Sequence, residues 1–443
     1  MAKARVYGFV PAKGSSERVA NKNMRFLDGE RLYIRALKTL LKCKEIDRVF
    51  LDTESEEMYA QCDFLPITFM KRDPALASNK TDGHQMFMNE VRQYPDADIY
   101  VQMLCTSPFI QPETIDRAIM ELENSEKYDS AILMKREKCY FWREGRPTYD
   151  IGHIPNSKDL PDSVTESMGL YIHKRESAMR TGRRYGDRPL LLFGQPAELV
   201  DVNTPEDLEF AATLARGMRA KVNARLEMIK HMMSSAAVSD VLDDMKMEFG
   251  ENCGAVLPGW STNGTGRMRK IIGRAATLKL RRLREGEDFK GIYTALKSYE
   301  GLTDNSIIVV ENEVSECAYF GGLNARLAIR AGAVAAVVDG ATRDKRDTAW
   351  LDFPVYSRGY NPQDVRHRAT VESMGKPVSI SGATVSSGDL VFIDDDAVVV
   401  IYQKYESLVI NRVCRTILNE GEISADIVNG VGVGGLVAEH GEF

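Results

Sequence analysis

The stretch RVYGFVPAKGSSERVANKN, residues 5–23, decides the fold of the first half of the chain. An apolar strand runs straight into a Gly/Ser turn that carries three cations, Lys13, Arg18 and Lys22. A turn of this kind at a strand end exposes consecutive backbone N–H groups toward an anion, and the cations can neutralise phosphate charge. The pattern is neither G-x-x-x-x-G-K-[ST] nor G-x-G-x-x-G. Read alone, it also fits an ordinary solvated loop.

Outward from this turn, short apolar runs alternate with stretches of helical spacing up to Asp207. The expected strands lie in residues 5–12, 47–52, 98–105, 129–135, 168–174 and 190–202, and the expected helices in 33–43, 81–94 and 114–124. Strands separated by helices predict right-handed βαβ crossovers and a mostly parallel sheet. Ligands of such sheets bind at the carboxyl ends of the strands.

A long helix should open at Thr204-Pro205-Glu206-Asp207 and run to about Met232, because Thr caps well and Pro suits the first turn. A second helix should follow, capped by Ser239 or Asp240. We divide the chain into residues 1–225 and 226–443. The second half is a further α/β unit, richer in β structure. Its expected strands lie in residues 273–283, 305–313, 333–340, 354–359, 376–385 and 389–402, and its expected helices in 288–300, 323–331 and 405–418.

Composition excludes several classes of protein. The 443 residues carry 58 Lys and Arg against 64 Asp and Glu, a net charge of −6, which argues against a dedicated nucleic-acid binder. Seven scattered cysteines form no C-x-x-C pair, so we expect reduced thiols in a cytosolic protein. No apolar run is long enough to span a bilayer, and no signal peptide is visible. The six histidines lack metal-ligand spacing, and we assign them no metal.

A series of motifs gives the first half a family resemblance. The motifs are PAKGSSERVANKN at 11–23, RDPALA at 72–77 with Thr81, TSP at 106–108, ESMGLYI at 166–172 and DVNTPED at 201–207. In this order they resemble the acylneuraminate cytidylyltransferases and their relatives that activate 3-deoxy-ulosonic acids, over about residues 4 to 215. The resemblance implies a Rossmann-like nucleotidyltransferase domain that transfers CMP from CTP to a sugar-acid hydroxyl with Mg²⁺ (or Mn²⁺) and releases pyrophosphate.

Residue roles follow from the same resemblance. Ala12, Lys13, Gly14, Ser15 and Ser16 would wrap the CTP phosphates. Lys13, Arg18 and Lys22 would bind them and act in catalysis, whereas Asn23, Arg72 and Thr81 would lie near the base and ribose. Asp201, with Asn203, would hold the metal, because a hard carboxylate oxygen suits Mg²⁺.

The sequence departs from the family pattern on both sides of this site. Lys13 stands where the family usually has Arg, Glu17 where it has Lys, and Asn203 where it has a second aspartate, which should weaken metal binding. On the acceptor side, Leu104-Cys105 replaces Gln-Pro, Ile110 replaces Arg, and Asn156-Ser157-Lys158 replaces an Arg/Gln-rich segment. We therefore expect an acidic acceptor other than sialic acid: another nonulosonic acid, an ulosonic acid or a phosphonate.

The second half has its own constellation. Gly321-Gly322-Leu323 precedes a strand that ends at Asp339, and Arg343, Asp344 and Asp347 follow on the next loop. Arg offers a fixed fork to a carboxylate or carbonyl, and Asp can hold a divalent metal. An exposed Arg-Asp pair at a turn is the plainer interpretation of the dipeptide alone.

The spacing G-x20-R-D-x2-D, with VSDVLDD, GRAATLK and GATV around it, resembles the class II pyruvate aldolases of the 4-hydroxy-4-methyl-2-oxoglutarate aldolase type over about residues 236 to 403. This RraA-like family, with a swivelling α/β fold, includes the regulators of RNase E activity. The resemblance implies that N–H groups near Gly321, Gly322 and Leu323 hold a pyruvyl carboxylate of a 2-oxo acid, Arg343 its keto oxygen, and Asp344 with Asp347 the metal. Members form ring-shaped oligomers, so a homo-oligomer is expected.

Two local features have plain interpretations. Residues 267–284 hold eight cations and no acid, which fits a solvated strand face or subunit contact; attraction of phosphate or of RNA are the alternatives. Asp394-Asp395-Asp396 fits a hairpin turn.

We therefore expect a bifunctional enzyme, a cytidylyltransferase fused to a metal-dependent aldolase or decarboxylase. The alternative is a cytidylyltransferase whose second domain is a catalytically silent oligomerisation or regulatory module.

Overall fold

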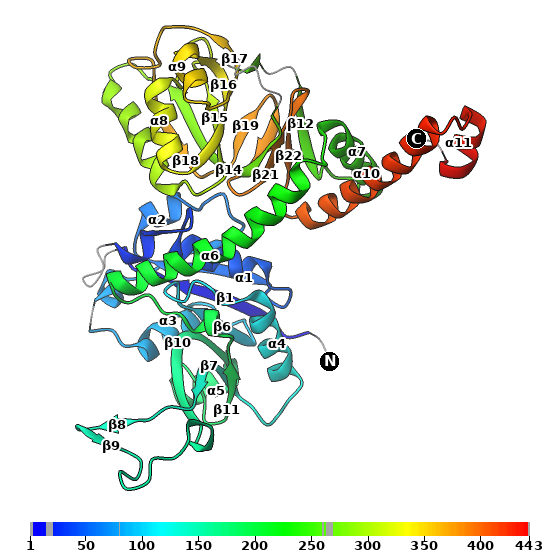
Figure 1. The fold of residues 1–443 in the computed structure, drawn as a ribbon. Helices are drawn as coiled ribbons and strands as arrows, with labels where there is room; N and C mark the ends of the chain where they lie inside the picture. Colours follow the sequence, from blue (N-terminus) through cyan, green and yellow to red (C-terminus); the bar gives the residue numbers. More distant parts are fainter. Residues whose placement is uncertain (1–2, 15–20, 79, 259–260, 263–268, 442–443) are drawn as a thin grey trace. The chain divides into compact units, whose positions relative to one another are not determined.

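The computed structural model describes residues 3–14, 21–78, 80–258, 261–262 and 269–441. These form two compact units, residues 1–215 and 216–443 (Figure 1). The division falls inside the long helix α6 (Pro205–Lys230), before the sequence-based division at residue 225. Among the described residues, no helix combines the length and apolar character that crossing a bilayer requires.

The first unit is a seven-stranded sheet with helices on its faces (Figure 1). The strand order is β11 (Pro189–Phe193), β7 (Ser130–Glu137), β10 (Ser163–Lys174), β6 (Ile99–Met103), β1 (Val6–Pro11), β4 (Arg48–Thr53) and β5 (Thr68–Lys71). The helices are α1 (Leu32–Lys42), α2 (Glu56–Ala60), α3 (Gly83–Gln93), α4 (Pro112–Glu123) and α5 (Arg175–Thr181). Only β10 runs antiparallel to its neighbours, so the expected mostly parallel sheet is confirmed.

The sheet explains where a ligand can bind. All six residues of β1 are buried, because helices cover both faces of the sheet around it. The chain leaves β1 toward β4 on one side and returns to β6 on the other. The order of strands therefore reverses between β1 and β6, and their carboxyl ends form the crevice in which α/β sheets bind ligands.

The second unit is built around a nine-stranded mixed sheet. Its strands are β12 (Gly254–Pro258), β22 (Ala397–Ile401), β21 (Leu390–Ile393), β14 (Ile271–Arg282), β15 (Ser306–Asn312), β16 (Ala333–Thr342), β17 (Val355–Tyr360) and β13 (Ser261–Thr262), with β18 (Ala369–Met374) also paired to β14. Its helices are α7 (Ser235–Phe249), α8 (Gly322–Arg330), α9 (Lys345–Trp350), α10 (Glu406–Val428) and α11 (Val433–His440). The α/β class is confirmed for both halves, and β21 and β22 pair as the hairpin expected around Asp394.

Three helices in the second unit differ from the sequence-based ones, in cap, type or length. Ser234, and not Ser239 or Asp240, caps α7, because its hydroxyl accepts the N–H of Ala237. Residues 289–301 form a 3-10 helix. In it, a Cβ on Gly291 would lie 2.3 Å from the Thr370 hydroxyl, a contact that only glycine allows. Helix α10 continues past residue 418, through Gly421, to Val428.

All seven cysteines are free thiols, and five of them are buried: Cys43, Cys62, Cys105, Cys253 and Cys317. This agrees with the expected reduced thiols. The thiol of Cys105 has its pKa raised to about 12 by burial, so it stays protonated and cannot serve as a nucleophile near neutral pH.

The core of the first unit contains a buried histidine that should make the protein sensitive to acid. His173 is fully buried on β10 and stacks on Phe87, with ring centroids 5.8 Å apart. Burial lowers its pKa from 6.5 to about 4. Between these pH values the unfolded chain binds a proton that the folded chain excludes, so the free energy of unfolding should fall as the pH falls. The loss from this group should reach about 3 kcal/mol.

His173→Phe should keep the stacking and remove this part of the acid sensitivity. The measurement is chemical unfolding at pH 7.5 and pH 4.5, with exposed His153→Ala as the control. If His173→Phe and wild type lose the same stability between the two pH values, His173 is not the acid-sensitive group.

Candidate functional site

The turn after β1 lies at the crevice between β1 and β6. The Gly14 N–H donates to Glu54 Oε1 at 2.7 Å, and the Lys13 ammonium donates to the Ser78 carbonyl at 3.0 Å. A Cβ on Gly14 would lie 3.0 Å from the Cβ of Ser55, so the turn packs closely against the end of β4. The buried Ala12 anchors the start of the turn. Ser15, Ser16 and Arg18 lie outside the described residues.

Two residues that follow the turn connect it to distant parts of the chain. The Asn23 amide donates to the Lys13 carbonyl at 3.0 Å, and its oxygen lies 3.2 Å from Cys105 Sγ, just past β6. Lys22 Nζ donates to Asn203 Oδ1 at 3.3 Å. The structure thus brings Lys13, Lys22 and Asn23 together with residues from the far end of the unit, as a site at this crevice requires.

Asn203 links the cation of Lys22 to the carboxylate of Asp201. Its oxygen accepts from Lys22 and its Nδ2 donates to Asp201 Oδ2. Both ends of the amide are therefore used, whereas an aspartate here would face Asp201 with a second negative charge. The backbone N–H of Asn203 donates to Asp207 Oδ2 at 2.9 Å, which fixes the segment at the start of α6.

Asp201 has the chemistry of a Mg²⁺ ligand. Its Oδ1 is buried and has no hydrogen-bond partner among the described residues. The next residue, Val202, donates its N–H to the Thr106 carbonyl at 2.8 Å, which holds Asp201 at the end of β6. A buried carboxylate oxygen without a donor is costly unless a cation meets it. Asp201 therefore fits the predicted metal ligand, while the Asn203 oxygen is already engaged by Lys22.

Arg72 supports the turn from inside the domain. Its side chain is 1% exposed; Nε lies 2.8 Å from Asp52 Oδ1, and an Nη donates to the Asp52 carbonyl at 2.6 Å. Its other Nη lies 3.8 Å from Glu54, the residue that accepts the Gly14 N–H. Arg72 thus fixes the end of β4 that positions the turn. Thr81, also predicted near the nucleotide, lies just before α3, with its hydroxyl 3.3 Å from that of Ser78.

A buried acid pair lies beside Arg72. Glu90 on α3 is fully buried, and its carboxyl accepts the Gln102 amide at 2.8 Å. Burial, together with the nearby Asp52 carboxylate, raises the pKa of Glu90 well above its usual value. Burial also raises the pKa of Asp52, although Arg72 opposes the shift. Arg72 therefore pairs with Asp52 beneath the turn, whereas the Glu90 carboxyl is held by the Gln102 amide.

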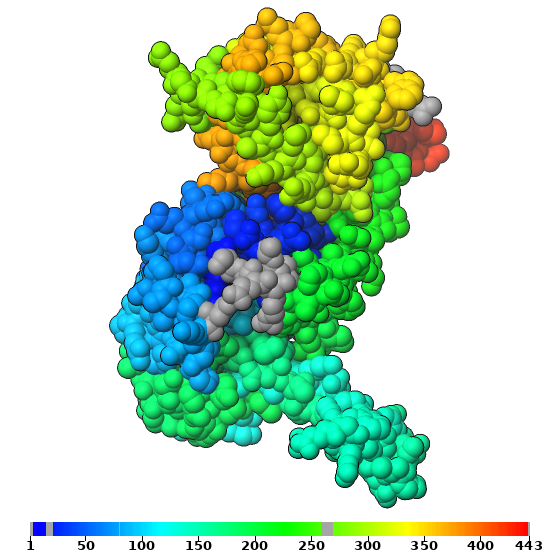
Figure 2. All heavy atoms as spheres, turned by 90° about the vertical axis from the view of Figure 1, so that its left-hand side faces the viewer, coloured from blue at the N-terminus to red at the C-terminus, as the bar shows by residue number. Residues whose placement is uncertain are grey.

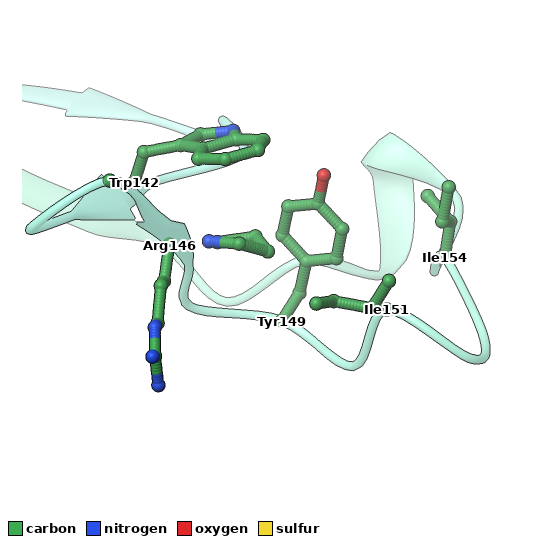
Figure 3. Close-up of a pocket in the computed structure, with 7 residues that line it drawn as sticks. Trp142, Arg146, Tyr149, Ile151 and Ile154 are labelled. Carbon is green, nitrogen blue, oxygen red and sulfur yellow. The ribbon is translucent and has the colours of Figure 1, made fainter.

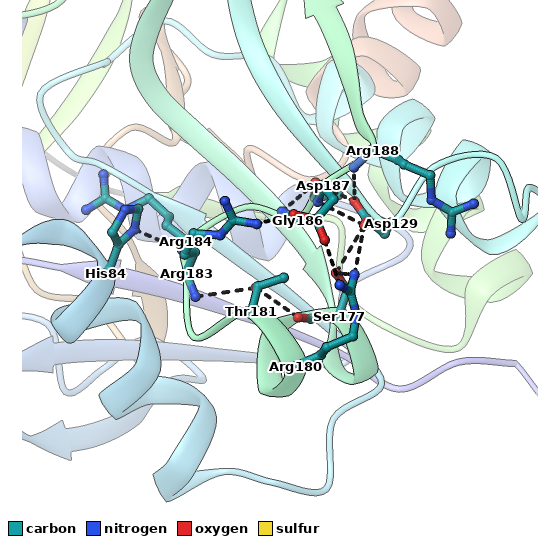
Figure 4. A network of polar contacts seen from close by, with 11 residues as sticks. His84, Asp129, Ser177, Arg180, Thr181, Arg183, Arg184, Gly186, Asp187 and Arg188 are labelled. Carbon is teal, nitrogen blue, oxygen red and sulfur yellow. Dashed lines mark hydrogen bonds and ion pairs between the residues drawn. The ribbon is translucent and has the colours of Figure 1, made fainter.

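Sequence reasoning missed a cation that lies against the ESMGLYI motif. The Arg184 guanidinium lies 4.4 Å from the ring centroid of Tyr171, and the Tyr171 hydroxyl donates to Glu166. Both partners belong to the ESMGLYI motif. Arg184 Nε is buried with no hydrogen-bond partner in the described residues. The backbone N–H of Arg184 donates to His84 Nδ1 at 3.1 Å (Figure 4).

The loop that carries Arg184 is fixed by Asp129. Its carboxylate accepts the N–H groups of Asp187 and Arg188, each at 3.1 Å, and the hydroxyl of Ser177 at 3.1 Å (Figure 4). A buried carboxylate with several donors is a rigid anchor. The loop therefore holds Arg184 in place. The motif spacing in the sequence does not predict this position of Arg184.

One pocket of the first unit lies apart from this site. It is formed by the arm, residues 139–162, which contains β8 (Trp142–Arg143) and β9 (Arg146–Pro147) and stands out in Figure 2. The cavity of about 430 Å³ is lined by Trp142, Gly145, Arg146, Pro147, Tyr149, Ile151 and Ile154 (Figure 3). Its lining is mostly apolar, with Arg146 as its one charged side chain, and contains no carboxylate that could hold a metal ion.

In the second unit, Arg343 and Asp344 lie at the carboxyl end of β16, as predicted. Arg343 Nη2 lies 2.7 Å from Asp364 Oδ2, an acid that the sequence analysis did not single out. Asp344 adopts a left-handed backbone conformation, with φ of 56°, and precedes α9. A non-glycine residue in this region is uncommon and points to a constrained site.

The Gly321-Gly322 pair packs directly on this loop. The Gly322 N–H donates to Asp344 Oδ2 at 2.9 Å, and a Cβ on Gly321 would lie 2.5 Å from the same oxygen. Asp347 lies 3.9 Å from Arg326, with its side chain 60% exposed, and Leu323 is 76% exposed. The structure brings Gly322, Arg343 and Asp344 together. In the part of the chain described, Asp344 and Asp347 are not joined by a third ligand into a metal-binding cluster.

The cations of residues 267–284 are largely paired with acids. Arg274 binds Glu406 through both Nη atoms, Arg281 lies 2.7 Å from Glu287, and Arg282 lies 3.0 Å from Glu316. Lys279 lies 3.3 Å from Glu311. Arg267 is outside the described residues. Pairing of this kind favours the plain interpretation over a phosphate or RNA surface.

Known proteins resemble parts of this chain, each covering less than half of it. Protein DlpA of Legionella pneumophila is 30% identical over 199 residues, which cover 44% of this chain and 31% of that protein. The N-acylneuraminate cytidylyltransferase of Escherichia coli is 20% identical over 219 residues, which cover 48% of this chain and 52% of the enzyme. The solved structure of Streptomyces coelicolor RraAS2 matches with a TM-score of 0.37 and 23% identity, over 43% of this chain and 90% of that one.

The chain thus spans about a third of the length of Protein DlpA and about half of the length of the Escherichia coli enzyme. The family models divide the chain in the same way as the motifs. Residues 7–142 match the family described as Cytidylyltransferase, and residues 235–400 match the family described as Aldolase/RraA. The chain therefore joins a cytidylyltransferase-family domain, over residues 7–142, to an Aldolase/RraA-family domain, over residues 235–400.

Proposed function

We propose that the first half transfers CMP from CTP to a hydroxyl group of an acidic acceptor. The acceptor oxygen attacks the α-phosphorus, a new P–O bond forms, and the bond to the bridging oxygen of the β-phosphate breaks. Pyrophosphate leaves with the electron pair of that bond, and the hydroxyl proton passes to solvent. The observation that carries the proposal is the chain of contacts Lys22, Asn203 and Asp201 at the crevice beside the turn.

In this proposal the turn and two lysines hold the triphosphate. Lys13 and Lys22 would offset the charge of the phosphates, with Arg18 as a third cation, and Ser15 and Ser16 would complete the turn around them. The N–H groups of Ala12 and Gly14 donate to the Asp52 carbonyl and to Glu54 Oε1, so these two groups hold the turn in place. Asp201 would hold Mg²⁺ or Mn²⁺ through its unpartnered oxygen, and the metal would neutralise charge on the leaving pyrophosphate. Arg72 acts indirectly, because its guanidinium is used to fix Asp52 and Glu54.

The acceptor is an acid: a nonulosonic or ulosonic acid, or a phosphonate. Arg184 supports this choice, because its buried Nε has no hydrogen-bond partner among the described residues and its loop is held rigidly by Asp129. An Arg fork binds a carboxylate or phosphonate with two parallel hydrogen bonds. The N-acylneuraminate cytidylyltransferases among the relatives act on such an acid, as their name states.

For the second half we propose a metal-dependent aldolase or decarboxylase activity on a 2-oxo acid, in a homo-oligomer. In aldol cleavage, the hydroxyl at C4 loses its proton and becomes the carbonyl of a released aldehyde or ketone as the C3–C4 bond breaks; in decarboxylation, the C4 carboxylate leaves as CO2. The electron pair of the broken bond stays on the pyruvyl fragment as an enolate, and protonation at C3 gives pyruvate. Arg343 would face the keto oxygen, and Asp344 would hold the metal. The observation that supports this is the adjacent placement of Arg343, Asp344 and the Gly322 N–H.

The full chain should use CTP in preference to ATP, GTP and UTP. The measurement is pyrophosphate release with each nucleotide, Mg²⁺ and a panel of acidic sugars and phosphonates. We expect release with CTP and at least one acid of the panel, and none with the corresponding neutral sugars. Calorimetric titration should show the same order of nucleotide binding.

Equal or better binding of ATP or GTP would contradict the proposed nucleotide. If CTP binds but no acid of the panel is used, the result supports CTP as the nucleotide and contradicts the proposed class of acceptor.

A further inference from the structure

The C-terminal helices contain a cluster of possible metal ligands that neither proposed activity uses. Asp426 on α10 and Glu439 and His440 at the end of α11 each present one ligand atom, and these atoms all lie within 4.8 Å of one another. In the part of the chain described, they are the one such group of three. Both helices follow residue 400, where the second family match ends (Figure 1).

The cluster is built by the fold of the helix pair. Helix α10 ends at Val428, and Gly430, with φ of 84°, reverses the chain. The Val431 N–H donates to the Asp426 carbonyl at 3.0 Å, so the turn closes on the residue that supplies the first ligand. Leu436 is the buried residue of α11, with 4% of its surface exposed.

The histidine is what separates this cluster from an ordinary acidic patch. The His440 side chain is only 8% exposed, and its Nε2 lies 2.7 Å from Asp426 Oδ2. A ligand set of one imidazole and two carboxylates suits Zn²⁺ and neighbouring transition metals, whereas Mg²⁺ and Ca²⁺ prefer oxygen atoms alone. Ligands of a tetrahedral Zn²⁺ at about 2.1 Å lie about 3.4 Å apart. The three atoms, now within 4.8 Å of one another, would have to move to that spacing when the ion binds.

We propose that Asp426, Glu439 and His440 bind a divalent transition metal, Zn²⁺ best, and that the metal fixes α11 on α10. The three ligands leave the fourth tetrahedral position to water or to a group from elsewhere. The site is separate from Asp201 and Asp344, since it uses a nitrogen ligand and lies on different elements. It is also one that histidine spacing could not predict, because its other two ligands are acids.

The test is calorimetric titration of zinc chloride into the full chain and into three variants, His440→Ala, Asp426→Asn and Glu439→Gln. Wild type should bind one zinc ion more than His440→Ala, and each carboxylate variant should bind that ion at least tenfold more weakly. His153→Ala, which removes an exposed histidine elsewhere, should bind as wild type does. Circular dichroism checks that the variants fold.

A second measurement localises the ion. Crystals soaked in zinc should show an anomalous peak between His440, Asp426 and Glu439, and zinc should slow amide exchange in residues 433–440. If His440→Ala binds as many zinc ions as wild type with the same affinity, or if the peak lies only elsewhere, the cluster is an ion pair and the proposal is wrong.

Discussion

Asp201→Ala should lower the rate of cytidylyl transfer by about 100-fold or more, whereas Asn203→Ala should lower it by less. The reason is that the two side chains differ in charge and in whether an oxygen atom is still available to bind a metal ion. Asp201 keeps a buried oxygen without a hydrogen-bond partner, in the part of the chain described, and carries the charge that a divalent cation needs. Asn203 is neutral, and both ends of its amide are engaged, by Lys22 and by Asp201.

The measurement is pyrophosphate release at saturating CTP over a range of Mg²⁺ concentrations. Asp201→Ala should fail even at high Mg²⁺, while Asn203→Ala should recover part of its rate there, because its loss comes from a displaced Lys22 and a less well held Asp201. Glu126→Ala, an exposed acid remote from the turn in sequence, is the control for the loss of one negative charge. Equal losses in both variants would show that Asn203 shares the metal.

Much of the architecture could be predicted from the sequence, because buried positions in helices and strands are occupied by apolar residues at regular spacing. The fully buried β1 is a continuous apolar run, and α1 buries Leu32, Tyr33, Ala36, Leu37 and Leu40 at helical spacing. Errors arose where local signals conflict with tertiary contacts. Gly421 suggests the end of a helix, yet α10 runs through it, and Ile423 beyond it is buried.

The site was predictable only in part, since its residues meet across large distances in sequence. The motif order indicated Lys22 and Asp201, but not that Asn203 would connect them. Arg72 was expected to lie near the base and ribose, but its burial against Asp52, which depends on β4 and β5 being neighbours, could not be predicted. Arg343 pairs with Asp364, and His440 contacts Asp426. Both contacts depend on the conformation of loops and turns, which hydrophobic periodicity in the sequence does not predict.

In the second half, Arg343→Ala and Asp344→Ala should each abolish measurable pyruvate release from 2-oxo acids. An enolate that develops on a keto acid needs positive charge fixed in place before the bond breaks, and preorganised charge is usually the largest catalytic contribution. Arg343 and a metal on Asp344 supply two such charges at adjacent positions. Asp364 holds the Arg343 fork at 2.7 Å and Asp344 accepts the Gly322 N–H at 2.9 Å, so both side chains are already oriented.

Arg343→Lys should fail to restore activity, because a single ammonium cannot reproduce the two parallel donors of a guanidinium. The assay couples pyruvate release from oxaloacetate and 4-hydroxy-2-oxo acids to lactate dehydrogenase, with Mg²⁺ or Mn²⁺ and with EDTA. Arg330→Ala, an exposed arginine on α8, is the matched control and should act as wild type. If wild type releases no pyruvate from any of these acids, or if Arg343→Ala and Asp344→Ala match it, the aldolase proposal is wrong. A silent oligomerisation or regulatory domain then becomes the better account of residues 235–400, and the cytidylyltransfer proposal is unaffected.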